Sequence, residues 1–238
     1  MIIDTHCHFD MMPNPEVYIR EREAAGNIVI GMTNLPSHFA MGFPHVRQFQ
    51  HIRLALGLHP LLAAENRHEV TNFKKYVNQT SYIGEIGLDF SKEGYPTKDA
   101  QVAVLRELLS VLKGKNKIVS VHSRRAEKEL FSLLCEYEIP NVIFHWYSVS
   151  ANLVPAIIER GYYFSVNEAM CFSNSGRQII SKIPQDRLLT ETDAPYNERC
   201  SIPKLLASIG ADEGVVYNNF KRLLAKLAVD KHMEDVNP

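Results

Sequence analysis

The chain alternates between short apolar runs and longer stretches in which apolar residues recur at helical spacing. The short runs are rich in β-branched residues, which predicts buried strands, and the longer stretches predict helices with one apolar face. The predicted strands are Ile2–Thr5, Asn27–Thr33, Ile52–Leu58, Tyr82–Ile86, Ile118–Val121, Val142–Phe144, Tyr162–Val166 and Leu188–Thr190. The predicted helices are Glu16–Ala25, one near Pro44–Gln50, Glu69–Asn78, Lys98–Leu112, Ala126–Tyr137, Val149–Glu159, Ser175–Lys182, and two near Ser201–Ser208 and Glu213–Ala225.

This alternation of strands and helices predicts parallel βαβ units. Eight such units favour an α/β fold of the (β/α)8 TIM-barrel type, in one domain covering residues 1–238. An open, doubly wound sheet is the alternative. Its dinucleotide-binding version is disfavoured, because no Gly-x-Gly-x-x-Gly sequence follows a predicted strand.

The charge balance limits how the chain can bind nucleic acid. Lys and Arg number 26 against 27 Asp and Glu, which gives a net charge of −1 and argues against binding through broad positive charge alone. The net charge is still compatible with a nuclease that receives phosphate through bound divalent ions. The four cysteines are scattered, and no basic leader or membrane-length apolar run is present. We therefore expect a cytoplasmic protein with no membrane partner.

The residues that bind divalent metals lie where predicted strands end. In a barrel, the C-terminal ends of the strands open onto one face, where the active site is built. If histidines and carboxylates were placed at random along the chain, they would also fall on helices and loops. The candidate metal ligands at strand ends are His6, His8, Glu85, His122, His145 and Asp193.

Four histidines and two carboxylates are too many for one tetrahedral ion that keeps an open position. They predict a site for two divalent ions, with a bridging carboxylate and a shared water of lowered pKa. Nitrogen and oxygen donors without thiolate favour Zn, Mn, Fe or Co, with Mg possible where oxygen dominates. Cys7 lies between His6 and His8 on a strand and should point to the opposite face.

These residues lie in motifs that resemble those of the TatD family of metal-dependent deoxyribonucleases. The blocks occur in family order from Asp4 to Tyr196, and the Glu85 and Asp193 blocks are the most specific. The N-terminal segment and the chain length are also similar to the QatD branch, which is encoded in anti-phage Qat cassettes. The motifs are His6-Cys7-His8, Gly57-Leu58-His59-Pro60, Gly84-Glu85-Ile86-Gly87-Leu88-Asp89, His122-Ser123-Arg124, His145, and Glu191-Thr192-Asp193-Ala194-Pro195-Tyr196.

The resemblance implies an amidohydrolase-type barrel that hydrolyses DNA phosphodiesters, often as a 3′-to-5′ exonuclease. It implies His6, His8 and Asp193 on one ion, and His122 and His145 on the other. Glu85 would bridge the two ions.

Two segments depart from the family pattern. Trp146-Tyr147-Ser148-Val149 replaces the usual run after the strand-six histidine. A basic loop that usually follows the position of Tyr196 is shortened to Asn197-Glu198-Arg199-Cys200. That loop would supply phosphate contacts, so its loss affects the expected affinity, and the shortened rim could either open the pocket or leave room for a partner protein.

Three residues are candidates for catalysis. Asp193 is expected to act as ligand and water activator, with a helix N-cap as the alternative. Glu85 on a buried apolar strand is hard to explain without a metal, because an unpaired buried carboxylate is costly. Arg124 shares the face of His122 and is a candidate phosphate clamp, with a rim salt bridge as the alternative.

Further residues are candidates for contact with substrate. His59 could contact a phosphate or serve the loop. Trp146 and Tyr147 could stack an unpaired base, although an aromatic residue at a strand end is more often core. Glu191 could orient a ligand or touch a third ion, and Asp89 could hold Arg124 or a ligand histidine.

The function that these features favour is a two-metal phosphodiesterase that trims single-stranded or frayed DNA ends. Two alternatives stay open. One is an amidohydrolase acting on a small amide or lactone, and the other is a metal-bearing subunit of a multi-protein defence complex.

Overall fold

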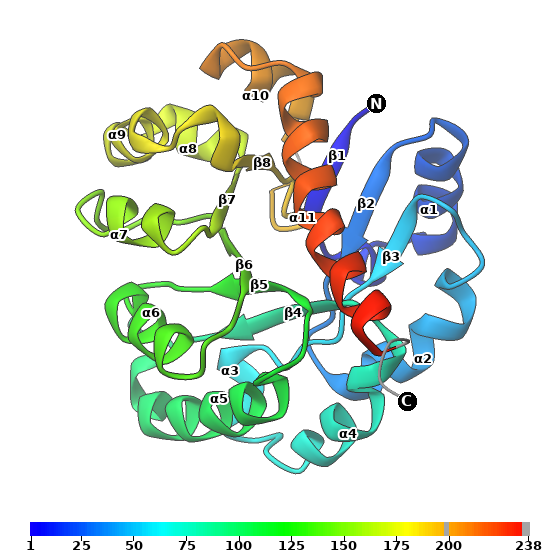
Figure 1. Ribbon diagram of the computed structural model, residues 1–238, viewed down its shortest axis with the longest axis vertical. Helices are drawn as coiled ribbons and strands as arrows, with labels where there is room; N and C mark the ends of the chain where they lie inside the picture. The colour runs from blue at the N-terminus through cyan, green and yellow to red at the C-terminus, as the bar shows by residue number, and fades with distance from the viewer. Residues whose placement is uncertain (198–199, 235–238) are drawn as a thin grey trace.

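In a computed structural model of the chain, the described residues form eight parallel strands around a common axis, with helices on the outside (Figure 1). The strands form two sheets with the orders β1-β2-β3 and β4-β5-β6-β7-β8. The predicted (β/α)8 arrangement is therefore confirmed. The strands are β1 Ile3–Cys7, β2 Ile28–Gly31, β3 Ile52–Leu54, β4 Tyr82–Gly87, β5 Ile118–His122, β6 Asn141–His145, β7 Tyr163–Val166 and β8 Leu188–Thr190.

The structure describes residues 1–197 and 200–234, with side chains up to residue 227. Within these ranges, no helix combines the length and the apolar character needed to cross a membrane. The α-helices are α1 Pro15–Ala24, α2 Pro36–Val46, α3 Pro60–Ala63, α4 Glu69–Tyr76, α5 Lys98–Leu112, α6 Glu127–Glu136, α7 Val154–Glu159, α8 Glu168–Phe172, α9 Asn174–Lys182, α10 Ile202–Ile209 and α11 Glu213–Glu234. Short 3-10 turns are η1 Phe9–Met11, η2 Val77–Gln79, η3 Tyr95–Thr97 and η4 Gln185–Arg187.

The two sheets meet where the chain leaves β3 and enters β4. Leu56 accepts a hydrogen bond from the Gly84 amide at 3.0 Å and donates one to the Tyr82 carbonyl at 3.0 Å. Thr33, just after β2, donates its amide to the Gly84 carbonyl at 3.2 Å and accepts from the Glu85 amide at 3.3 Å. These bonds fix the backbone on both sides of Glu85.

Hydrogen bonds connect β8 to β1, from threonine side chains and from the residues that follow each strand. The Thr5 hydroxyl donates to the Thr190 carbonyl at 3.0 Å. Beyond the strands, the Asp193 amide donates to the His6 carbonyl at 2.9 Å, and the His8 amide donates to the Ala194 carbonyl at 2.7 Å. The end of β8 is thereby held beside the histidines of β1.

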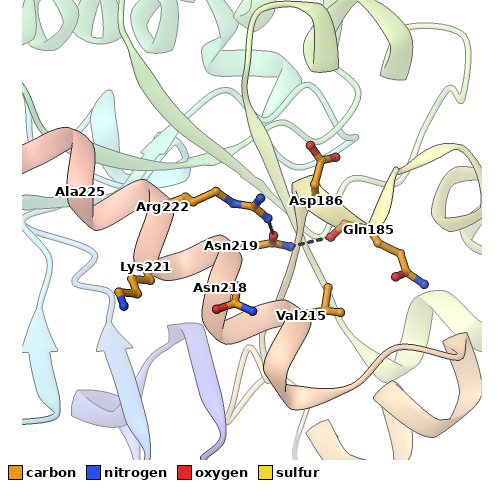
Figure 2. A pocket seen from close by; sticks show the side chains of 8 residues that line it. All are labelled: Gln185, Asp186, Val215, Asn218, Asn219, Lys221, Arg222 and Ala225. Carbon is orange, nitrogen blue, oxygen red and sulfur yellow. Dashed lines mark hydrogen bonds between the residues drawn. The ribbon is translucent and has the colours of Figure 1, made fainter.

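Helix α11 crosses one end of the barrel (Figure 1). Its apolar side chains pack against residues near the amino ends of the strands, so α11 covers the end opposite the metal-binding candidates. Asn219, in the first half of this helix, is fully buried and donates to the Gln185 carbonyl at 2.6 Å (Figure 2). It also donates to the Leu188 carbonyl at 2.7 Å. The packed residues include Ile3, Ile118, Tyr163, Val216, Phe220 and Leu223.

Three predicted helices differ clearly from the observed ones, and one of them is α11, which was predicted to end at Ala225 but continues to Glu234. The helix predicted near Pro44–Gln50 is α2, which begins at Pro36 and ends at Val46. The helix predicted from Val149 begins at Val154, where Pro155 occupies the first turn that suits it. The short helices α3 and α8 were not predicted.

Candidate metal centre

Glu85 lies at the centre of the candidate site, on β4 and 2% exposed. Its Oε2 atom faces the Nε2 atoms of His6 at 3.4 Å and His8 at 3.2 Å. Its Oε1 atom faces Nδ1 of His122 at 2.7 Å and Nε2 of His145 at 2.8 Å. The two oxygens of one buried carboxylate thus face two different pairs of histidines.

The first group of donors comprises His6, His8, Asp193 and Glu85. The two histidine Nε2 atoms lie 3.3 Å apart, and each lies 3.7 Å from Asp193 Oδ1. Four ligands about 2.1 Å from one tetrahedral Zn²⁺ would lie about 3.4 Å from one another. The donor separations in this group therefore fit one ion of this kind.

The second group comprises His122, His145 and Glu85. Nδ1 of His122 and Nε2 of His145 lie 3.4 Å apart. The ring of His145 also stacks on the ring of His6, with centroids 3.8 Å apart. The two groups are therefore contiguous. The structure brings together all six residues that sequence analysis singled out as ligands, whereas Cys7 lies behind them and contacts the Tyr18 hydroxyl.

Neighbouring side chains set the orientation of the histidine rings. Nε2 of His122 lies 2.9 Å from Asp89 Oδ2, and Nδ1 of His6 lies 2.9 Å from the Ser120 hydroxyl. A proton on these outer nitrogens leaves a lone pair on each nitrogen that faces Glu85. Asp89 therefore holds a histidine, which decides between the two roles considered for it. Its other oxygen accepts from the Ser91 amide.

Glu191 is fully buried and forms hydrogen bonds in the interior. It accepts from the Trp146 amide at 3.0 Å, from Asn167 Nδ2 at 2.9 Å and from the Ser165 hydroxyl. With three donors already on its oxygens, Glu191 orients the residues after β6 and β7. Nothing in this geometry supports a third ion, which stays a prediction.

The carboxylates of the site differ in their protonation. Burial raises the pKa of Glu85, but the surrounding histidines, with His145 the strongest, outweigh it and hold that pKa well below its usual value. Burial raises the pKa of Asp193 to about 7, and nearby His145 opposes the rise. Asp193 lines the pocket beside the facing nitrogens of His6 and His8, a position that suits a group that accepts a proton from water.

His59 differs from the other histidines in its hydrogen bonding. It lies close enough to Glu85 and His122 to share an ion with them. Its Nδ1 atom, however, accepts a hydrogen bond from the Leu61 amide at 3.2 Å, so the proton of the neutral ring lies on Nε2. Burial also lowers the pKa of His59 to about 4, which keeps the ring neutral. We therefore interpret His59 as a hydrogen-bond donor that faces the pocket.

The donor groups lie in a pocket of about 670 Å³. Arg124 is exposed on its wall, and no ion pair of Arg124 is present in the described ranges, so the rim salt bridge considered for it is not observed. Trp146 lines the pocket, and its contact with a base stays a prediction. Tyr196 also lines it, and sequence analysis did not propose it as a substrate contact, although it belongs to the Asp193 motif.

The expectation that Tyr147 stacks a base is wrong. Its side chain is fully buried, and its ring packs between Phe144 and Phe164 with its hydroxyl donating to the Ser150 carbonyl at 2.7 Å. Trp146 has a φ of +35°, a left-handed conformation that breaks the alternation of a strand. The chain therefore directs Trp146 toward the pocket and Tyr147 into the core.

Gly87 allows β4 to approach β5 beside His122. Its φ is +145°, and a Cβ atom there would lie 2.0 Å from the His122 carbonyl oxygen. Only glycine fits so close to the neighbouring strand. The approach places Asp89, two residues later, within hydrogen-bond reach of the His122 ring.

Histidines and carboxylates gathered at the C-terminal ends of barrel strands define a class, the barrel-type metal-dependent hydrolases. The family model for TatD related DNase matches residues 3–225. The chain therefore belongs to the TatD family and is a metal-dependent hydrolase of that family.

Individual relatives agree with this assignment. The metal-dependent hydrolase YjjV of Escherichia coli is 30% identical over 208 residues, which cover 81% of this chain and 79% of YjjV. The 3′-5′ ssDNA/RNA exonuclease TatD of Edwardsiella piscicida is 26% identical over 219 residues, covering 80% of this chain and 82% of that protein. The crystal structure of E. coli YjjV superposes with a TM-score of 0.76 and 26% identity, covering 97% of this chain and 96% of YjjV.

Proposed function

We propose that this hydrolase is a deoxyribonuclease that uses two divalent ions to remove nucleotides from single-stranded or frayed 3′ ends. The observation that carries the proposal is Glu85, whose two carboxylate oxygens face two separate groups of donor atoms. A buried carboxylate in that position suits a bridge between two ions.

The residues divide by role. His6, His8 and Asp193 would hold one ion, and His122 and His145, whose facing nitrogens lie 3.4 Å apart, the other, with Zn, Mn or Mg as the metals that suit these donors. Bound ions of this kind lower the pKa of water and neutralise charge that develops on phosphate oxygens. Asp193 would accept the proton of the attacking water. Arg124 would hold a non-bridging phosphate oxygen, and the Nε2 proton of His59 would be donated to another.

Two further observations favour the end of a nucleic acid strand as substrate. The donor atoms are deeply buried, with His6 and Glu85 almost inaccessible. We expect the backbone phosphates of an intact duplex not to reach them. The Edwardsiella relative is named as an exonuclease acting on single-stranded DNA and RNA. A flexible single-stranded end fits the buried position of the donor atoms and agrees with the activity named for that relative.

The test uses end-labelled single-stranded and double-stranded DNA with Mg, Mn or Zn. Wild type should shorten single strands from the 3′ end, and Glu85→Gln should lose activity by at least about 100-fold, since removing a group that acts on the transition state costs this much or more. Glu69→Gln is the matched control, because Glu69 is also a buried glutamate but lies on α4 outside the site. Failure to cleave any of these strands, with turnover of small amides or lactones, would favour the amidohydrolase alternative instead.

We also propose a cytoplasmic location and a role within a multi-protein anti-phage complex, on the strength of the resemblance to the QatD branch. Phage-plating assays with His122→Ala test the role. Loss of protection would show that the metal centre serves defence. Protection retained by this variant would show that the protein serves the complex as a binding subunit, and no effect of deleting the gene would reject the defence role.

A further inference from the structure

The pocket has two chemically different sides. The residues that line it after β6 and β8, other than the candidate ligands, are Trp146, Ser148 and Tyr196, which carry no charge. We call these residues the aromatic side. Across the pocket, Arg124 lines the wall at the end of β5. We call Arg124, together with Lys92 and Arg125, which are exposed on the loops after β4 and β5 but do not line the pocket, the cationic side.

The two aromatic residues are held in place by specific contacts. Tyr196 is 59% exposed, yet its ring meets the His8 ring edge to face with centroids 5.3 Å apart. Its hydroxyl donates to Met11 Sδ at 3.2 Å, which ties the loop after β8 to the one after β1. The Trp146 backbone is fixed by Glu191. Tyr196 is exposed and Trp146 is partly buried but lines the pocket, and aromatic faces that reach a pocket in this way are suited to stacking on a base.

The cations of the other side belong to two loops that are joined. The Phe90 amide donates to the Arg124 carbonyl at 2.8 Å, which holds the loop after β4 against the loop after β5. Lys92 and Arg125 are exposed on these loops, and the single acid that lines the pocket beside them, apart from Asp89, is Glu93 within the described ranges. Arg124 and Glu93 line the pocket there and Asp89 is engaged with His122, whereas Lys92 and Arg125 are exposed on the same two loops and the Glu127 carboxylate accepts from the Arg125 amide at 3.2 Å.

The chemistry of a strand end matches this asymmetry. A terminal nucleoside with a free 3′ hydroxyl has a phosphate on its 5′ side only, whereas the remaining strand carries one phosphate per nucleotide. We propose that the terminal base stacks on Trp146 and Tyr196 while the rest of the strand leaves across Arg124, Lys92 and Arg125. This orientation rests on the proposed nuclease function and adds the residues that recognise the terminal base.

The test pairs protein variants with a change in the substrate. Two 5′-labelled single strands are compared, one natural and one whose 3′-terminal nucleotide lacks its base. Trp146→Ala and Tyr196→Ala should each lower kcat/KM on the natural strand by about 5- to 150-fold, the range for loss of one base–aromatic stack. On the strand with the abasic end, each loss should shrink to within about twofold, because the stacking partner is already absent.

Two control variants sharpen the comparison. Tyr196→Phe keeps the ring and should retain most of the activity on the natural strand. Phe172→Ala removes an aromatic side chain that is 76% exposed on α8 and does not line the pocket, so both strands should be cleaved as by wild type. Equal losses for Trp146→Ala and Tyr196→Ala on the two strands, or no loss on either, would overturn the proposal.

Salt dependence tests the cationic side separately. In Lys92→Ala/Arg125→Asn, the slope of log kcat/KM against log salt should fall by about 0.7 for each lost phosphate contact. Asn is used at position 125 because Arg125 has a φ of +59° and Asn tolerates this conformation. An unchanged slope would place the strand elsewhere. If wild type cleaves phosphodiesters but the variants change neither the activity on the natural strand nor the salt slope, this orientation alone is rejected. If wild type cleaves no phosphodiester, the proposed function is rejected.

Discussion

Asp4 is a buried carboxylate outside the donor groups, and it should make stability depend on pH. Burial raises its pKa from 3.8 to about 7, although hydrogen bonds from the Thr192 side chain and amide oppose the rise. The folded state therefore holds the proton more tightly than the unfolded state does. This contribution to stability is complete below about pH 4 and is lost as the pH rises to about 7.

The variant Asp4→Asn keeps the shape of this side chain and cannot ionise. We expect wild type to lose stability relative to Asp4→Asn between pH 4 and pH 7, by on the order of a few kcal/mol. Chemical denaturation of both proteins across this range measures the difference. Parallel stability curves for the two proteins would show that Asp4 does not ionise in this window.

His59 should matter for activity without holding metal. In His59→Asn, the amide oxygen can still accept the Leu61 N–H at the start of α3, while the Nε2 donor that faces the pocket is lost. We expect kcat/KM to fall by about 10- to 100-fold, as for a lost hydrogen bond to a charged group, with metal content unchanged. Elemental analysis beside kinetics measures both. Loss of an ion from this variant would make His59 a ligand.

Some features of single residues lie beyond sequence reasoning. Strand alternation from His145 would point Tyr147 into the pocket and Trp146 away from it, but the left-handed backbone of Trp146 reverses this. The hydrogen bond from Ser120 to His6 links β5 to β1 across the barrel, and no spacing along the chain indicates it. Both features depend on the tertiary structure.

At the scale of elements, the attachment of α11 depends on Asn219. Its buried amide donates to two backbone carbonyls at η4 and β8, and Asn219→Ala would leave both without that donor. The expected loss is about 1–3 kcal/mol for each unsatisfied group. Thermal or urea denaturation measures it. Asn218→Ala, on the exposed face of the same helix, is the matched control and should be nearly neutral; similar losses for both variants would contradict this role.

The helices show which local signals the sequence carries. Lys98–Leu112 was predicted with its observed bounds, because five apolar residues share one face. Pro36 and Pro155 lie in the first turns of α2 and α7. Reading each proline as a signal for the start of a helix would have predicted the first residues of both helices more accurately. For α8 the signal was the N-cap Asn167, whose side chain accepts from the Met170 amide.

At the scale of the molecule, the gathering of the six candidate ligands could be predicted because barrel topology brings strand ends together wherever they lie in the sequence. The proposed division of the donors between two ions came from the family resemblance alone, because spacing along the chain does not indicate it. That division depends on the rotation of the Glu85 carboxylate, and on the rings held by Asp89 and Ser120. The seam between the two sheets at Leu56 likewise depends on tertiary contacts.

Bound metal should stabilise the whole barrel, because the donors come from β1, β4, β5, β6 and the segment after β8. Ions at 100 times their dissociation constant would add about 2.7 kcal/mol per site if they do not bind the unfolded chain. We expect a chelator to lower Tm in wild type and in Glu69→Gln, with a much smaller shift in Glu85→Gln. Calorimetry with and without chelator measures this, and equal shifts in all three proteins would place the stabilising ions elsewhere.

Glu85 joins two ion sites in the proposed function, and native mass spectrometry can check this by counting the ions held by each folded chain. At saturating metal, wild type and Glu69→Gln should each carry two ions, and Glu85→Gln should carry fewer. A catalytically active wild type that never holds more than one ion, or Glu85→Gln that still holds two, would contradict the account.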